Sequence, residues 1–285
     1  MIRAYADLLR PANVVTALAD VLAGYALAGL GRASALPWLL GATACLYAGG
    51  VVLNDFFDRR LDSIERPERP IPSGRVPPQH AATIAALLLA AGLILAFRAT
   101  PPAGVIAAAI ASFVVLYDAW GKRHPPGPAI MGLCRALNLL LGVAAMPEML
   151  NQRAVIAGIP FSYVVAITAL SRGEVHGGVR RVATFALVSL GIALSGLALV
   201  ASQSREPAWS GVVLVFLTWR VLPPFVNARR SPDARRIRHA VRTGVLSLVL
   251  VNAVIGTAYA GPVYGAMILT IALVAGWLAR LFAVT

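Results

Sequence analysis

Long apolar runs recur along the chain, and short polar segments that carry most of the charge separate them. Each run is close to the ~20 residues that a helix needs to cross the hydrocarbon core of a bilayer. The runs predict membrane helices at about 12–30, 36–55, 80–98, 102–118, 128–147, 153–171, 182–201, 208–226, 240–260 and 263–283. No stretch looks like a separate soluble domain. We therefore expect one all-α domain over residues 1–285, a polytopic transmembrane helical bundle.

The composition agrees with a membrane protein. Of the 285 residues, 59% are hydrophobic and 13% are charged, about half the charged fraction of an average soluble domain. A net charge of +13 would also suit a nucleic-acid-binding protein, but the basic residues are divided among the segments between apolar runs, as topology determinants are. No basic stripe with interleaved aromatic residues offers a nucleic-acid surface. We expect no nucleic-acid partner.

The basic residues are divided unequally between the two sides that the helices define. With the N-terminus inside, 19 of the 25 Lys and Arg residues fall in inner segments. Four others fall in outer loops, and two fall within helices. Such a contrast follows the positive-inside rule. The inner loops, including 56–79 and 172–181, are therefore expected to face the cytoplasm.

Polar residues gather where the second apolar run ends, in Val51-Val-Leu-Asn-Asp-Phe-Phe-Asp-Arg-Arg-Leu-Asp62. If the helix continues through this stretch, Asn54, Asp55, Asp58 and Asp62 share one face. Like charges packed this closely repel unless a positive group lies among them. Hard oxygen ligands of this kind suit Mg²⁺, which usually takes one or two protein carboxylates together with water and substrate phosphate. With the five arginines that follow, the stretch predicts a site for a metal-bound diphosphate.

The pattern Asn-Asp-x-x-Asp-x-x-x-Asp, with Arg69-Pro70 and Gly74 downstream, resembles the first aspartate-rich motif of the UbiA superfamily of membrane prenyltransferases. The alternative is a solvated helix end with arginines that set topology. The resemblance implies nine to ten spans around a central cavity that opens to the cytoplasmic side. It also implies that Asp55, Asp58 and Asp62 are metal-binding and catalytic residues, and that Asn54 and Arg69 bind substrate.

The first predicted membrane helix carries two further candidates. Arg10-Pro11 and Asn13 resemble the family's N-terminal pattern, in which the Asn lines the central cavity and binds substrate. Asp20 lies about two turns further along. An Asp within a membrane span is costly and is by default a functional candidate that faces the bundle interior. A structural hydrogen bond from Asp20 to a neighbouring helix is an equally open interpretation.

Two later segments resemble substrate-binding parts of the family. Tyr117-Asp-Ala-Trp-Gly-Lys-Arg123 is similar to a Tyr followed by Lys-Arg that holds diphosphate. Lys122, also a catalytic candidate, and Arg123 can bind phosphate oxygens, and the ring of Tyr117 can shield an allylic cation. Arg135 and Asn138 are three residues apart and therefore on one face. They match an Arg-x-x-Asn pair that lies near the second substrate in many members.

The segment Ser171-Arg-Gly-Glu-Val-His-Gly-Gly-Val-Arg-Arg181 stands at the place of the family's second aspartate motif. Glu174 occupies the first acidic position and is a candidate metal ligand and catalytic residue. Gly178 occupies the second acidic position, so one ligand of that motif is missing. His176 is a possible replacement, although a lone His at a membrane interface is more often structural. The missing acid puts the usual two-metal arrangement in question.

By resemblance, the protein is a Mg²⁺-dependent enzyme that transfers a prenyl group from a polyprenyl diphosphate to an acceptor. The acceptor is unidentified, and could be aromatic, a sugar phosphate or a cyclitol. The segments 134–138 and 171–178 look most like the UbiA-like branch called EboC. We expect the protein in the inner membrane of a bacterial cell, with its active site facing the cytoplasm and the basic run 227–238 anchored to anionic membrane lipid.

Two other function classes differ in how well the sequence fits them. A non-catalytic or weakly catalytic component for prenyl-lipid binding or export would fit the truncated second motif. A phosphatidyltransferase of the CDP-alcohol type would need a longer Asp-Gly-x-x-Ala-Arg signature, which the sequence lacks.

Overall fold

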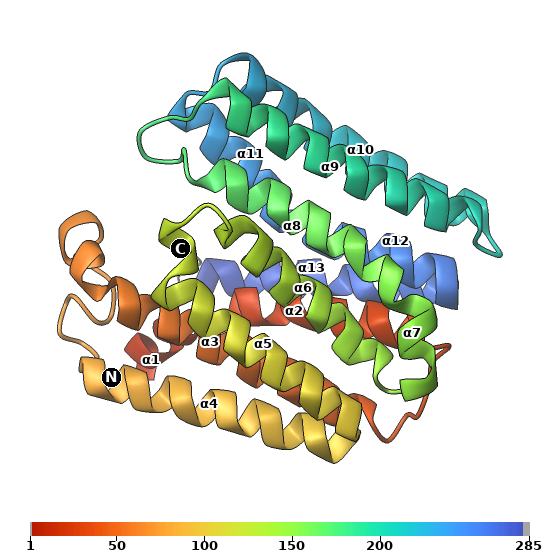
Figure 1. The fold of residues 1–285 in the computed structure, drawn as a ribbon, viewed down its shortest axis with the longest axis horizontal. Coiled ribbons are helices and arrows are strands. Elements are labelled where there is room, and N and C mark those ends of the chain that lie inside the picture. Colours follow the sequence, from red (N-terminus) through yellow and green to blue (C-terminus); the bar gives the residue numbers. More distant parts are fainter. Residues whose placement is uncertain (1, 282–285) are drawn as a thin grey trace.

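The structure is a computed structural model that describes residues 2–281, and the regular structure within that range is helical (Figure 1). The α-helices are α1 (Ile2–Leu9), α2 (Pro11–Leu27), α3 (Leu36–Glu65), α4 (Pro78–Ala99), α5 (Pro101–Ala119), α6 (Gly127–Val143), α7 (Leu150–Arg153), α8 (Gly158–Ser171), α9 (Arg180–Ser202), α10 (Pro207–Arg230), α11 (Ala234–Leu246), α12 (Leu248–Ala260) and α13 (Pro262–Leu281). Three 3₁₀ helices join them, η1 (Gly121–Arg123), η2 (Pro147–Met149) and η3 (Ala154–Ala157).

Each apolar run that predicted a membrane helix is helical over most of its length, which confirms the all-α prediction within the described range. The run at 240–260 differs, because a turn at Ser247 divides it into α11 and α12. Seven helical segments of the described chain are long and apolar enough to cross a membrane, and α6 and α13 are shorter apolar helices. The prediction of nine to ten spans goes beyond that finding, and residues 282 and 283 of the last run lie outside the described range.

Prolines mark where many of the helices begin. A proline occupies the first or second position of α2, α3, α4, α5, α6 and α10, and α13 begins at Pro262. Proline is well suited to this position, because the first N–H groups of a helix have no partner within it and the fixed φ of proline is already helical. These prolines explain why the apolar runs end abruptly at sharp connections.

The helices form two outer groups with a central layer between them (Figure 1). Helices α3, α4 and α5 form one group, α8 to α11 form the other, and α2, α6, α12 and α13 lie between. Helices α2 and α6 approach so closely that a Cβ atom on Gly24 would lie 2.0 Å from the Leu139 carbonyl oxygen, and one on Gly142 would lie 2.2 Å from the Val21 carbonyl oxygen. Small residues permit such backbone contact. The contact brings the polar residues of α2 and α6 together inside the bundle.

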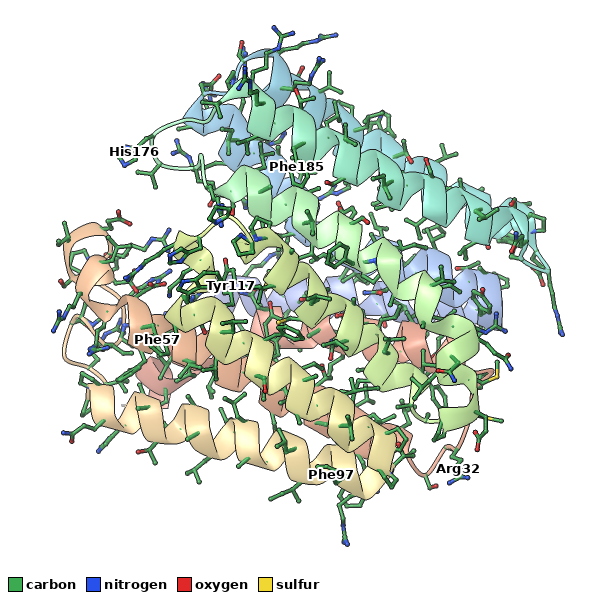
Figure 2. All side chains as sticks on the ribbon, viewed as in Figure 1. Arg32, Phe57, Phe97, Tyr117, His176 and Phe185 are labelled. Atoms are coloured by element: carbon green, nitrogen blue, oxygen red, sulfur yellow. The ribbon has the colours of Figure 1, made fainter. Side chains whose placement is uncertain are left out.

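One end of the bundle gathers α1, the turns after α3, the α5–α6 connection and the loop between α8 and α9; His176 and Phe57 lie at this end, and Arg32 lies at the other (Figure 2). Polar contacts tie these segments together: Arg172 Nη2 donates to the carbonyl oxygen of His124, and Arg238 Nη1 donates to that of Glu174 at 2.8 Å. The loops that the charge pattern placed on a common side therefore lie at a common end of the molecule.

Candidate functional site

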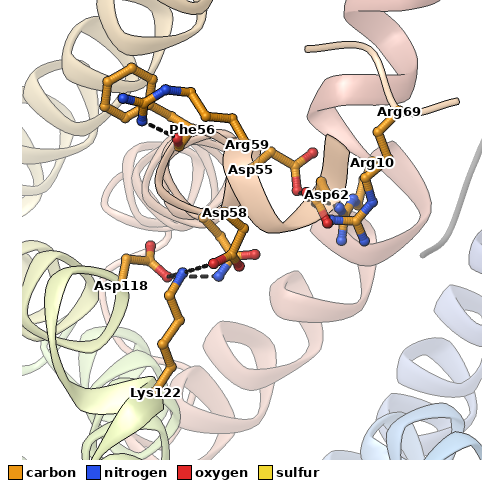
Figure 3. Close-up of polar contacts among 10 residues, drawn as sticks. Arg10, Asp55, Phe56, Asp58, Arg59, Asp62, Arg69, Asp118 and Lys122 are labelled. Atoms are coloured by element: carbon orange, nitrogen blue, oxygen red, sulfur yellow. Dashed lines mark hydrogen bonds and ion pairs between the residues drawn. The ribbon is translucent and has the colours of Figure 1, made fainter. Parts of the chain in front are cut away.

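The first motif lies within α3, which continues without a break to Glu65. Its side chains divide between two neighbours (Figure 3). Asp55 and Asp62 turn toward the segment after the helix, where Arg69 Nη1 lies 3.3 Å from Asp55 Oδ1 and 2.7 Å from Asp62 Oδ2. Arg10, at the junction of α1 and α2, places its Nη2 atom 2.6 Å from the same Asp55 oxygen. One half of the motif is thus neutralised by two arginines.

The other half of the motif faces the end of α5. Lys122 Nζ lies 2.6 Å from Asp58 Oδ1 and 3.9 Å from Asp118 Oδ1. Asn54 Nδ2 donates to Asp118 Oδ1 at 2.8 Å. Helical geometry explains why the motif divides in this way. Each residue turns the helix by about 100°, so positions 54 and 58 lie near one edge of the shared face and positions 55 and 62 lie near the other. The positive groups that the clustered aspartates require are therefore Arg10, Arg69 and Lys122.

These charges lie in a poorly solvated setting. Asp55, Asp62 and Asp118 are 3%, 4% and 4% exposed, and Arg69 is 8% exposed. Removing a single partner from such a pair leaves a buried charge without compensation, which costs more than the pair itself contributes. When a ligand enters, every buried carboxylate and every buried cation of the site must therefore still have an opposite charge beside it.

The donor set fits Mg²⁺. Asp55 and Asp62 both contact a single cationic nitrogen, and Asp58 and Asp118 share another. Among the described residues no three His, Cys, Asp or Glu side chains enclose a common metal position. Mg²⁺ usually takes one or two protein carboxylates and completes its octahedron with water and substrate phosphate. The aspartates of α3, with Asp118 of α5, supply such pairs of hard oxygen ligands.

A cavity of about 370 Å³ extends from this charged end into the bundle. Its polar lining includes Arg10, Asn54, Tyr117 and Asp118, together with Thr43, Arg135 and Asn138. The rest of the lining is mostly apolar and comes from α3, α5, α6, α8, α11 and α12. A largely apolar chamber with charged groups at its end suits an amphiphile with an anionic head and a hydrocarbon chain.

The polar part of the cavity rests on a buried network around Asp20, which is 1% exposed. Arg135 Nε lies 2.8 Å from Asp20 Oδ2, and Asn138 Nδ2 donates to the same oxygen at 2.8 Å. Asn252 Nδ2, on α12, donates to Asp20 Oδ1 at 2.7 Å. Of the two open interpretations of Asp20, the structure favours the structural one, because its carboxylate links α2, α6 and α12 and is not among the groups that line the cavity.

The other residues that were predicted to bind substrate do not all line the cavity. Tyr117 is half-buried and lines the cavity beside Asp118. Arg123 ends η1 with an exposed side chain. Asn13 lies in the first turn of α2, one turn from Arg10, and is not among the residues that line the cavity. The structure therefore brings Asn54, Tyr117, Arg135 and Asn138 to the cavity wall. The other predicted site residues are not among the residues that line it: Asn13, Asp55, Asp58, Asp62, Arg69, Lys122, Arg123 and Glu174.

The segment at the second motif forms turns between α8 and α9, and it is tied to the α10–α11 turn because the Gly178 N–H donates to the Pro232 carbonyl oxygen at 2.9 Å. Glu174 is half-buried there. Burial raises the pKa of the Glu174 carboxyl, and the positive charges of Arg66 and Arg238 oppose that rise. The charge of Arg66, the residue that follows α3, therefore acts on the Glu174 carboxyl. Glu174 does not form a cluster with the aspartates of α3.

Sequence reasoning did not single out Asp118, nor the pairing of Arg10 with Asp55. The rule that marks an Asp within a membrane span as a functional candidate applies to Asp118 as well as to Asp20. Arg10 also has a left-handed backbone, with φ of 47°. Such a conformation is uncommon for a non-glycine residue, and it places the Arg10 side chain next to α3. No signal in the sequence indicates that backbone conformation.

The model of the UbiA prenyltransferase family matches residues 17–219. The chain belongs to the UbiA prenyltransferase family. The digeranylgeranylglyceryl phosphate synthase of Ignicoccus hospitalis is 35% identical over 236 residues, which are 76% of this chain and 77% of that protein. The family and the enzyme class that the motifs predicted are confirmed.

Solved structures of UbiA proteins share the fold. A structure described as digeranylgeranylglyceryl phosphate synthase in membranes superposes with a TM-score of 0.70 at 19% identity, over 90% of this chain and 98% of that one. A UbiA homologue from Archaeoglobus fulgidus bound to DMAPP and Mg²⁺ superposes with a TM-score of 0.63 at 15% identity, over 93% of this chain and 99% of that one. That homologue holds DMAPP and Mg²⁺ in the fold that this chain shares.

Proposed function

We propose that this UbiA prenyltransferase moves a prenyl group from a polyprenyl diphosphate, with Mg²⁺, to a hydroxyl group of a glycerol-phosphate-type acceptor in the membrane. The observation that carries the proposal is the set of paired carboxylates and cations at the charged end of an apolar cavity. The relatives named as digeranylgeranylglyceryl phosphate synthases support the class of acceptor. They also favour a geranylgeranyl donor.

The residues of the site have distinct roles in this proposal. Asp55, Asp58 and Asp62 hold Mg²⁺, which neutralises the charge that develops on the departing diphosphate. Lys122 and Arg69, released from the aspartates that bind the metal, donate to phosphate oxygens. The bond between the prenyl carbon and the diphosphate oxygen breaks, and its electron pair leaves on the diphosphate. The acceptor oxygen forms the new bond to the prenyl carbon, and its proton passes to the departing diphosphate.

The apolar part of the cavity protects the reaction. The ring face of Tyr117 stabilises the developing allylic cation, and the surrounding helices exclude water that would react with it. Asn54, Arg135 and Asn138 orient the substrates from the wall, and the exposed Arg123 and the half-buried Asn13 act from the margin of the site. Glu174, at the second motif, is the carboxylate that we assign to a second ion.

The setting is also part of the proposal. The protein forms a single domain of nine to ten spans in a cell membrane, with the cavity open to the cytoplasmic side, and the excess of basic residues in the inner loops supports that orientation. A bacterial inner membrane remains our interpretation, although the relatives named above are archaeal. Segments 134–138 and 171–178 remain the reason to place the chain near the EboC branch.

The function can be tested with purified protein in sealed lipid vesicles whose orientation is known. Geranylgeranyl diphosphate and a geranylgeranylglyceryl phosphate acceptor should give Mg²⁺-dependent diphosphate release and an ether-linked product, from the side where the cytoplasmic loops are accessible. Aromatic, sugar-phosphate and cyclitol acceptors serve as competitors. Product from one of those acceptors alone would refute the glycerol-phosphate assignment, and release from the opposite side would refute the orientation.

A second candidate is a prenyl-lipid-binding or export component without turnover. The observation that favours it is the second motif, where Gly178 replaces an acid and Glu174 stands apart from the aspartates of α3. In that case the protein would bind the prenyl diphosphate but release no diphosphate in the vesicle assay.

Glu174→Gln is expected to lower the Mg²⁺-dependent rate about as strongly as a loss at Asp58 if Glu174 holds a second ion. Gly178→Asp should then tighten the Mg²⁺ dependence, because an added carboxylate fills an empty ligand position. A Cβ atom on Gly178 would lie 3.1 Å from Ile237 Cδ1, so the substitution requires the end of that side chain to shift slightly. Mg²⁺ titrations of activity measure both effects. No change in either variant would show that residues 171–178 are not a metal site.

A further inference from the structure

Asp118 is a buried carboxylate that belongs to neither aspartate motif. It lies near the end of α5, is 4% exposed and lines the cavity. Its Oδ1 atom accepts the Asn54 amide and lies 3.9 Å from Lys122 Nζ (Figure 3). A buried carboxylate is costly unless it is paired. Its position between two predicted substrate-binding side chains calls for a role in the site.

The carboxylate settles the orientation of the Asn54 side chain. An ionised carboxylate accepts hydrogen bonds and donates none, so the amide nitrogen of Asn54 faces Asp118 and the amide oxygen faces away. An amide in place of Asp118 could pair with either end of Asn54. The negative charge at position 118 therefore selects a single arrangement of Asn54 at the cavity wall.

The same carboxylate keeps a counter-charge beside Lys122. In the present arrangement Asp58 is the nearer partner, at 2.6 Å, and the Lys122 side chain is 13% exposed. When Asp58 turns to a metal-bound diphosphate, Lys122 would become a poorly solvated ammonium group without that partner. Asp118, four residues before Lys122, remains beside it. The ammonium group stays charged and directed to where the phosphate oxygens arrive.

We propose that Asp118 is a positioning residue of the diphosphate site, which acts through Lys122 and Asn54 without itself touching the substrate. This inference rests on the proposed function, because it concerns how the same site binds its prenyl diphosphate. Loss of the charge weakens the binding of the diphosphate and leaves unaltered the binding of the acceptor, for which we assign Arg135 and Asn138 on α6.

The test measures Asp118→Asn, Lys122→Met and the double variant in lipid vesicles, with geranylgeranyl thiolodiphosphate as the binding probe. Asp118→Asn is expected to raise the Kd of the probe and the KM for the prenyl diphosphate about tenfold, with a smaller change in kcat and no change in the acceptor KM. With Lys122→Met already present, the further effect of Asp118→Asn should fall below about threefold, since residues that act through one another are not additive. Ser112→Ala, an exposed position on α5, is the control.

The outcomes separate the inference from the function on which it rests. If the wild type binds the probe and Asp118→Asn has the same Kd, the positioning role alone is overturned. The same holds if the effects of Asp118→Asn and Lys122→Met on the Kd are fully additive in the double variant. Failure of the wild type to bind the probe would overturn the proposed function and this inference with it. If Asp118→Asn does not fold, Asp118→Glu takes its place in the cycle, because it keeps the charge but displaces it by one methylene group.

Discussion

Asp58→Ala should lower kcat/KM for the prenyl diphosphate by at least about a hundredfold and remove most of the Mg²⁺-dependent binding. The variant takes away a metal ligand and a charge-assisted contact of the reacting complex. It also leaves Lys122 without its nearer partner, at 2.6 Å. Product formation and equilibrium binding of a thiolodiphosphate, each titrated with Mg²⁺, measure the effect.

Glu65→Ala is the matched control for Asp58→Ala. Glu65 is a carboxylate of the same helix, it follows Asp62 by about one turn, and its side chain is exposed. Its removal should change neither rate nor binding by more than about twofold, because an exposed charge is well solvated and weakly coupled. If Asp58→Ala kept its binding and its Mg²⁺ dependence, the first motif would not be the diphosphate site.

Asp20→Leu should have the largest effect on stability, with a loss of about 3–5 kcal/mol in the free energy of unfolding. The Asp20 carboxylate is the partner of Arg135 and accepts from Asn138 and Asn252. Without it, the guanidinium group of Arg135, which is 7% exposed, becomes an uncompensated buried charge. Unfolding in detergent micelles, followed by circular dichroism, measures the loss.

The double variant Asp20→Leu with Arg135→Met tests the physical reason. Replacing both members of a buried ion pair by apolar groups is often neutral or stabilising, whereas removing one member is not. The double variant should therefore regain most of the stability lost in Asp20→Leu. A double variant as unstable as the single one would mean that packing around Leu at position 20, rather than the unpaired charge, causes the loss.

Local sequence information was sufficient for the helices and for the first motif. Apolar runs of about twenty residues predict membrane helices because the thickness of the bilayer sets their length. Prolines at the starts of α4 and α5 set sharp boundaries for the same runs. The spacing of Asn54, Asp58 and Asp62 places them on one helical face, since that spacing depends on the 3.6-residue period alone. These features need no knowledge of distant residues.

The partners of those residues were decided by the tertiary structure. Asn252 and Asp20 are 232 positions apart in the chain, and no local period relates them. The glycine contact between α2 and α6 brings Asp20 to Arg135, and the left-handed backbone of Arg10 brings its side chain to Asp55. A helical membrane protein with an aspartate motif of the UbiA family follows from local sequence patterns. The pairing of cations with carboxylates depends on how the helices pack. A buried charge is costly unless an opposite charge lies beside it, and here the opposite charge comes from another segment of the bundle.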